Sequence, residues 1–149
     1  MNNTTTKPKT IIYLRWMVRS DISDVLAIEE GSFKFPWFEQ DFIDSLRKRN
    51  TVGMVAEHDN RVVGFMIYEL HKTKLDLLKL CVDPKHKRTG IGTQMVYKMT
   101  SKLSYERRTK LQIEVDEYNL DGLLFLKKMS FIGSVQRDSS TYLMEYSYD

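Results

Sequence analysis

The sequence predicts an α/β fold, in which a mixed central sheet of about seven strands carries about four helices on both of its faces. Short segments rich in β-branched and aromatic residues alternate with segments whose apolar residues recur every three or four positions. Turn-forming residues separate these segments. With 149 residues, 42% of them hydrophobic, the chain can bury one core, and a single domain is expected over residues 11–149.

The N-terminal half is predicted to form strands and two helices after a polar tail. This tail, residues 1–10, lacks the apolar segment of a signal peptide and is expected to be disordered. Ser20 or Asp21 is the expected cap of the first helix. His58-Asp59-Asn60-Arg61 has the composition of a hairpin turn. In chain order, the predicted elements are a strand at 13–19, helices at 21–30 and 39–49, and strands at 52–57, 62–70 and 74–82.

The C-terminal half is predicted to alternate helices and strands. Ile91, Met95, Val96, Met99 and Leu103 lie along one side of a helix with 3.6 residues per turn. The apolar residues at 111, 113 and 115 alternate with polar ones, as in a half-buried strand. The predicted elements are a helix at 90–103, a strand at 110–115, a helix at 121–129, and a closing hairpin of strands at 131–137 and 141–147.

The segment after the strand at 74–82 has the features of an anion-binding loop. The apolar run stops at Asp83-Pro84, basic residues follow at 85, 87 and 88, and Gly90 and Gly92 begin the next helix. Glycines let backbone N–H groups approach a ligand, and a helix N-terminus attracts anions. The same pattern occurs in α/β proteins without a ligand. Neither G-x-x-x-x-G-K-[ST] nor G-x-G-x-x-G is present, so the loop alone leaves both interpretations open.

Together with later segments, this loop resembles the GNAT acetyltransferases. Residues 87–92, K-R-T-G-I-G, resemble the family's acetyl-CoA signature R/Q-x-x-G-x-G/A. Residues 111–119, L-Q-I-E-V-D-E-Y-N, and 127–131, K-K-M-S-F, resemble the L-E-V…N…A…L-Y…G-F segment of RimI-like enzymes, which acetylate the N-terminal amines of proteins. The resemblance extends from about Tyr13 to Tyr146. It implies the GNAT fold, with acetyl-CoA as co-substrate and a protein or peptide amine as acceptor.

The resemblance also implies where the co-substrate binds. The end of the strand at 74–82 is expected to offer free N–H groups to the pantetheine arm and the thioester oxygen, and the loop is expected to hold the pyrophosphate. Asn119 matches a family residue near the cofactor arm, although capping of the next helix is an equal alternative. The expected cofactor-binding residues are Leu80, Cys81, Val82, Lys87, Arg88, Thr89, Gly90, Ile91, Gly92, Thr93 and Asn119.

Cys81 could also be interpreted as a nucleophile. No His or Asp partner is apparent in the sequence, so a small buried residue on a core strand is expected instead.

Glu114 is the expected catalytic base. Alternation places it on the polar side of its strand, which by itself favours a solvated side chain. Its match to the family's L-E-V position implies that it removes a proton from the acceptor amine, directly or through water. The family also has a Tyr, often assigned as general acid, at the position of Leu126. Further departures from the family pattern are Lys87 for Arg, His86 for Tyr, Gly122 for Ala and Ser130 for Gly.

An aromatic segment between the first two helices is expected to border the acceptor cleft. Phe35, Pro36 and Trp37 are the candidate acceptor-binding residues, and Tyr142 is expected to form the opposite wall. Trp37 and Phe38 are expected to point inward, and Phe35 to lie nearer the cleft. An α-amine is favoured over lysine as acceptor by the resemblance and by its lower pKa. Two alternatives stay open: a small-molecule amine acetyltransferase of the same fold, and a catalytically weak CoA-binding or interaction module.

Composition and charge bear on which other partners, such as nucleic acid, a membrane or a metal, are expected. The net charge of +3 is modest and acidic residues separate the basic clusters, so no nucleic-acid partner is expected. No apolar stretch approaches the roughly 20 residues that span a bilayer, so no membrane partner is expected. A single cysteine excludes an intramolecular disulfide and suits the expected cytoplasmic location. The three histidines lack metal-ligand spacing, so no metal is expected.

Overall fold

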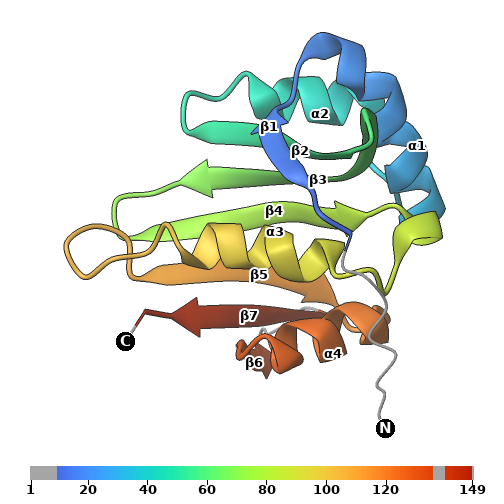
Figure 1. Ribbon diagram of the computed structural model, residues 1–149. Helices are drawn as coiled ribbons and strands as arrows, with labels where there is room; N and C mark the ends of the chain where they lie inside the picture. The colour runs from blue at the N-terminus through green and yellow to red at the C-terminus, as the bar shows by residue number, and fades with distance from the viewer. Residues whose placement is uncertain (1–9, 136–139, 149) are drawn as a thin grey trace, which may run out of the picture.

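The computed structural model describes residues 10–135 and 140–148, which form one sheet with helices on both faces (Figure 1). The sheet has seven strands in the order β1-β2-β3-β4-β5-β7-β6. Among the strands of the described residues, only the central pair β4–β5 is parallel. The predicted mixed sheet with about four helices on both faces is confirmed. The elements in chain order are β1 (Tyr13–Trp16), α1 (Ile22–Ser32), α2 (Glu39–Leu46), β2 (Thr51–His58), β3 (Arg61–Leu70), β4 (Lys74–Val82), α3 (Ile91–Thr100), β5 (Lys110–Asp116), α4 (Leu120–Lys128), β6 (Ile132–Val135) and β7 (Thr141–Ser147).

Most differences from the predicted bounds lie at element ends. β4 and β7 have the predicted bounds, whereas β1 ends at Trp16 because the chain turns there into a 3₁₀ turn at Arg19–Asp21. Both α2 and α3 end three residues earlier than predicted. The predicted strand at 131–137 is β6, and its last two residues lie outside the described residues. Of the predicted tail, residues 1–9 also lie outside them, while the N–H of Thr10 donates to the carbonyl of Thr89 at 3.1 Å.

The predicted hairpin turn between β2 and β3 is confirmed. Asp59 and Asn60 both have left-handed backbones, with φ of 50° and 62°, and His58 pairs with Arg61 across the turn. A two-residue turn of this kind matches the twist of its strands, and Asp and Asn tolerate positive φ better than other non-glycine residues. The local sequence therefore specifies the register of β2 against β3 next to the turn, up to the register shift between Ala56 and Glu57.

Two apolar clusters cover the two faces of the sheet. α3 and α4 lie over one face, here called the α3 face, where Met95 and Met99 pack with Leu111, Ile113 and Val115 of β5. α1 and α2 cover the N-terminal part of the other face, the α1 face, where Val25 and Phe42 are fully buried. Since β5 alternates, Gln112, Glu114 and Asp116 point to the α1 face.

A bulge divides β4 into two parts. β4 pairs with β3 on both sides of Leu78, but the register passes from Tyr68↔Leu77 directly to Ile67↔Lys79. Before the bulge Leu75 and Leu77 pack on the α3 face, and after it Leu80 and Val82 do so. A bulge bends its strand and shifts the alternation of side chains. The parallel pairing of β4 with β5 ends at the same place, with Leu77↔Ile113 as its last pair.

Arg15 holds the start of α1 through Asp21. Asp21 occupies the N-cap position, as predicted, but its side chain does not cap the helix. Its oxygens instead accept hydrogen bonds from Arg15 Nη1 and Nη2 at 2.8 and 2.9 Å, and from the N–H of Val18 at 2.8 Å. Arg15 Nε also donates to Glu57 at 2.8 Å. The hydrogen bonds from Arg15 lower the pKa of Asp21 despite its burial.

We expect the acid stability of the protein to depend on Asp21. Because its pKa is lower in the folded than in the unfolded state, its contribution is fully present above the unfolded pKa of about 4 and is lost as the pH falls through the folded pKa. Asp21→Asn should lower the free energy of unfolding by about 1–2 kcal/mol at neutral pH. Urea unfolding between about pH 7 and pH 3 should show a smaller loss on acidification in Asp21→Asn than in the wild type.

The matched control is Asp24→Asn, which changes an exposed carboxylate in the first turn of α1. It should keep the acid dependence of the wild type. Equal acid slopes in wild type and Asp21→Asn would contradict the role given to Asp21.

Candidate active site

Within the part of the chain that the structure describes, the backbone N–H groups at the start of α3 have no protein acceptor. Arg88 and Gly90 have left-handed backbones, with φ of 66° and 86°, and the hydroxyl of Thr89 donates to the carbonyl of His86 at 2.6 Å. Gly90 is the N-cap of α3 and offers no side chain to cap it. The N–H groups of the first turn have no acceptor within the helix. This N-terminus is therefore suited to an anion, as its sequence predicts.

Positive charge surrounds this N-terminus. Lys85, Lys87 and Arg88 have exposed side chains, and within residues 10–135 and 140–148 no carboxylate forms a salt bridge with them. These charges therefore add to the positive end of the α3 dipole. Gln94 fastens the loop from the other side: its side chain accepts from the N–H of Ile12 at 3.2 Å and donates to the carbonyls of Thr10 and Gly90.

The end of β4 has one free edge. Leu80, Cys81 and Val82 pair with β3, but β5 offers them no pairing partner because the parallel ladder stops at Leu77↔Ile113. Among the described strands, the backbone groups on that edge therefore have no strand partner, which the sequence could not show. Side chains divide between the faces: Leu80 and Val82 join the α3-face cluster, and Cys81, which is 5% exposed, joins the α1-face cluster. The buried Cys81 confirms the expectation of a small core residue.

The helices beside this edge are closely packed. A Cβ on Gly92 would lie 3.2 Å from Phe125 and 3.6 Å from Val82, so this glycine lets α3 approach α4 and β4. Phe125 was not identified from the sequence, because its place in α4 looks like that of any apolar residue. Asn119 is the N-cap of α4 and accepts from the N–H of Gly122 at 3.0 Å. A Cβ on Gly122 would lie 2.6 Å from Asn119 Nδ2, so a larger residue there would make the Asn119 side chain shift.

Glu114 and Tyr142 lie on opposite faces of the sheet. Glu114 is exposed on the α1 face, one residue after the last β4–β5 pair. Tyr142 is directly opposite Val115 and packs with the α3-face cluster. The two side chains are therefore not brought together, and the α1 face of β7 carries Leu143 beside Glu114 instead. Leu126 is 2% exposed within the α3-face cluster.

The aromatic loop between α1 and α2 differs in part from the prediction. Trp37 packs edge-on against Phe42, with ring centroids 5.1 Å apart, and Phe35 is 78% exposed. Phe38 was expected inward but is 74% exposed, because Trp37 fills the space above Phe42 and the Phe38 N–H is bound by Asp41 at the start of α2.

The loop tip reaches the β5–α4 connection. Lys34 Nζ lies 5.6 Å from the ring centroid of Phe35 and 6.0 Å from that of Tyr118. Tyr118 itself is 82% exposed. The α1–α2 loop and the β5–α4 connection therefore lie side by side on the surface.

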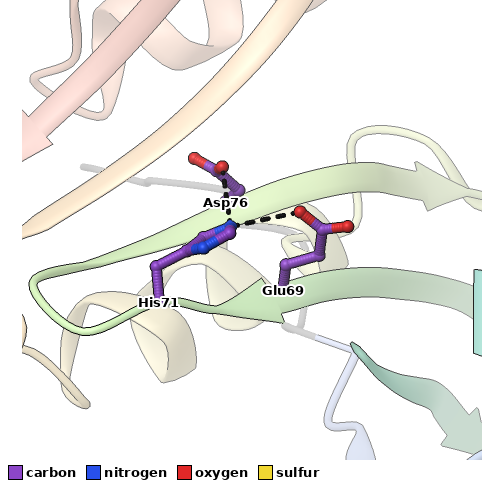
Figure 2. A group of neighbouring side chains, drawn as sticks. All are labelled: Glu69, His71 and Asp76. Atoms are coloured by element: carbon purple, nitrogen blue, oxygen red, sulfur yellow. Dashed lines mark hydrogen bonds and ion pairs between the residues drawn. The ribbon is translucent and has the colours of Figure 1, made fainter. Parts of the chain in front are cut away.

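A second cluster lies at the far end of β3 and β4. Figure 2 shows His71 between Glu69 and Asp76; its Nε2 is 3.1 Å from Glu69 Oε1 and 3.1 Å from Asp76 Oδ2. Two lysines balance the carboxylates, since Lys74 Nζ lies 3.6 Å from Asp76 and Lys48 Nζ 3.8 Å from Glu69. Lys74 also donates to Gln112 at 3.1 Å, and Gln112 donates to Glu145 at 2.6 Å. The cluster is thus part of a polar belt across β3, β4, β5 and β7.

Comparison with known proteins identifies the class to which this fold and site belong. Residues 21–131 match the acetyltransferase (GNAT) family, and the chain belongs to that family. It is therefore an N-acetyltransferase, with acetyl-CoA as its co-substrate. No helix within the described parts of the chain is long and apolar enough to cross a membrane.

Particular relatives agree with this class. The ribosomal protein bS18 alanine N-acetyltransferase of Salmonella typhimurium is 23% identical over 112 residues, 75% of each chain. Among solved structures, Ard1 from Thermoplasma volcanium has a TM-score of 0.80 at 23% identity, covering 93% of this chain and 98% of the other. Arabidopsis thaliana NAA60, solved with acetyl-CoA, has a TM-score of 0.73 at 16% identity, covering 92% and 98%. At these identities the solved structures show a shared fold.

The single cysteine provides a test of the packing at this site. Burial raises the pKa of the Cys81 thiol to about 11, so only about 0.1% of it is thiolate near pH 8. We expect Cys81 to react with a thiol-specific disulfide reagent at least about a hundredfold more slowly in the folded protein than in urea. In urea, one thiol per chain should react. Fast reaction of the folded protein would contradict the inert, buried state of Cys81.

Proposed function

We propose that this protein transfers acetyl groups from acetyl-CoA to a protein amine, with an N-terminal α-amine favoured over a lysine side chain. The observation that carries the proposal is the separation of β4 from β5 beside the N-terminus of α3. Glu114 is the first residue of β5 after its last pair with β4. The name of the Salmonella relative, an alanine N-acetyltransferase of a ribosomal protein, supports a protein acceptor.

The residues present fit acetyl-CoA. The N–H groups at 88–93 would hold the pyrophosphate, with Lys87 and Arg88 adding charge. Lys87 supplies a point charge where an Arg would supply a bidentate fork. The free edge of Leu80, Cys81 and Val82 would take the extended pantetheine arm. Bound acetyl-CoA supplies the thioester that the acceptor amine attacks. N–H groups on that edge would stabilise the negative charge that develops on the thioester oxygen.

Glu114 would accept the proton that the acceptor amine loses. As the amine nitrogen forms its bond to the acetyl carbon and the carbon–sulfur bond breaks, the nitrogen must lose a proton, and Glu114 takes it directly or through a water. An α-amine has a pKa near 7.7–8.0 and a lysine amine near 10.4, so obtaining a neutral lysine costs about 3.4 kcal/mol more. Leu126 offers no proton to the sulfur, but a thiol pKa near 8.5 lets thiolate leave near neutral pH.

The placement of the pyrophosphate predicts that Gly90 is required for CoA binding. Gly90→Ala puts a Cβ on a residue with φ of 86°, which strains the turn and displaces the first N–H groups of α3. We expect calorimetry to show CoA affinity reduced at least about tenfold. Gly31→Ala in α1 is the control, since its Cβ would meet only Pro84 at ordinary distance. Unchanged affinity in folded Gly90→Ala would move the pyrophosphate elsewhere.

The proposed activity is tested by acetyl-CoA turnover against α-amine peptides, N-blocked lysine peptides and small amines. We expect the α-amine peptides to react fastest. Glu114→Gln should then lower turnover by roughly 10²–10⁴-fold with CoA affinity unchanged. Glu117→Gln, which alters an exposed carboxylate beyond the end of β5, should retain turnover. Faster turnover of small amines would favour the small-molecule alternative, and CoA binding without turnover of any amine would favour a binding module.

A further inference from the structure

A buried ion pair lies on the α1 face next to the separation of β4 and β5. Glu29 of α1 has no exposed surface, and Lys79 of β4 exposes 12% of its side chain. Glu29 Oε2 accepts hydrogen bonds from Lys79 Nζ at 2.7 Å and from the backbone N–H of Trp37 at 2.8 Å. Glu29 Oε1 has no partner among the described residues. Lys79 and the Trp37 N–H therefore provide the stabilisation of this buried charge.

Two aromatic rings of the α1–α2 loop enclose the same ammonium group. Lys79 Nζ lies 4.4 Å from the ring centroid of Phe33 and 4.8 Å from that of Trp37, both within the range of cation–π attraction. Trp37 in turn packs against Phe42 of α2. One lysine thus joins the loop, at both of its ends, to β4.

The position of Lys79 relates this loop to the site. Lys79 is the second residue of β4 after Leu77, and the bulge at Leu78 turns it toward the α1 face. Glu114 is the first residue of β5 after its last pair with β4, and its side chain points to the same face. The exposed tip of the loop, with Phe35, reaches the connection that follows β5 through the contact of Lys34 with Tyr118. The loop held by Lys79 therefore lies on the side of the sheet where Glu114 is exposed.

We propose that Lys79 is a positioning residue for the acceptor: by anchoring residues 33–37 to β4, it fixes the loop tip against which the acceptor chain binds. The inference rests on the proposed function, because it assigns the α1 face to the acceptor. Lys79 acts through the loop and not on the reacting atoms. Because Glu29 neutralises its charge, Lys79 acts by holding the loop in position and not by attracting the acceptor.

Kinetics with an α-amine peptide test the effect on the acceptor. Lys79→Met keeps most of the side-chain length but removes the ammonium group. We expect kcat/KM for the peptide to fall roughly ten- to hundredfold, mainly through KM, with acetyl-CoA affinity unchanged. Lys79→Arg keeps a cation between the rings and should therefore retain most of the wild-type kcat/KM. Lys74→Met is the matched control, since Lys74 belongs to the same strand but pairs with Asp76 in the polar belt.

Trp37 fluorescence tests the anchoring without reference to activity. The chain has two tryptophans, so Trp16→Phe leaves Trp37 as the only one. In that background Lys79→Met should make Trp37 more accessible to a soluble quencher, and Lys74→Met should not. Folding is checked by circular dichroism. If Lys79→Met does not fold, Glu29→Gln/Lys79→Met takes its place, because it leaves no unpaired charge in the core.

The outcomes separate the two proposals. A peptide KM unchanged in a folded Lys79 variant, while the wild type is active, would overturn the positioning role. Unchanged quenching of Trp37 would overturn the anchoring on which that role depends. If the wild type acetylates no amine, the proposed function fails, and Trp37 quenching still decides whether Lys79 anchors the loop.

Discussion

The bulge at Leu78 is the constraint on which the rest of the site depends. β3 pairs with β4 on both sides of it, so β4 stays in the sheet while its bend takes it away from β5. The same extra residue shifts the alternation of side chains, which places Lys79 under the α1–α2 loop and leaves Leu80 and Val82 against α3. The free strand edge and the anchored loop therefore have one structural origin.

The polar belt lies at the other end of these strands, where β4 and β5 are paired. There Lys74 of β4 donates to Gln112 of β5, and Gln112 donates to Glu145 of β7. These bonds lie beside the paired part of β4 and β5, before the bulge. The two parallel strands are thus paired before the bulge and separated after it.

Sequence reasoning succeeded where the information is local. The turn at Asp59-Asn60, the bounds of β4 and the stripe of α3 each follow from residues close together in the chain. It failed where distant residues decide. Leu77 and Leu78 are both apolar, so an apolar run gives no sign of a bulge. The face of Tyr142 depends on the register of β7, and Glu29 and Lys79, fifty positions apart, each resemble a solvated charge when considered alone.

The hydrogen bonds of Gln94 have a practical consequence for work on this protein. They bind Thr10 and Ile12 to the first turn of α3, beside Gly90. At the other terminus the N–H of Tyr148 donates to the carbonyl of Thr109, just before β5 begins and far from that turn along the strands. An affinity tag or fluorescent fusion ahead of Thr10 would join the domain next to the loop before α3, the proposed pyrophosphate site, whereas one after Tyr148 would leave that loop accessible.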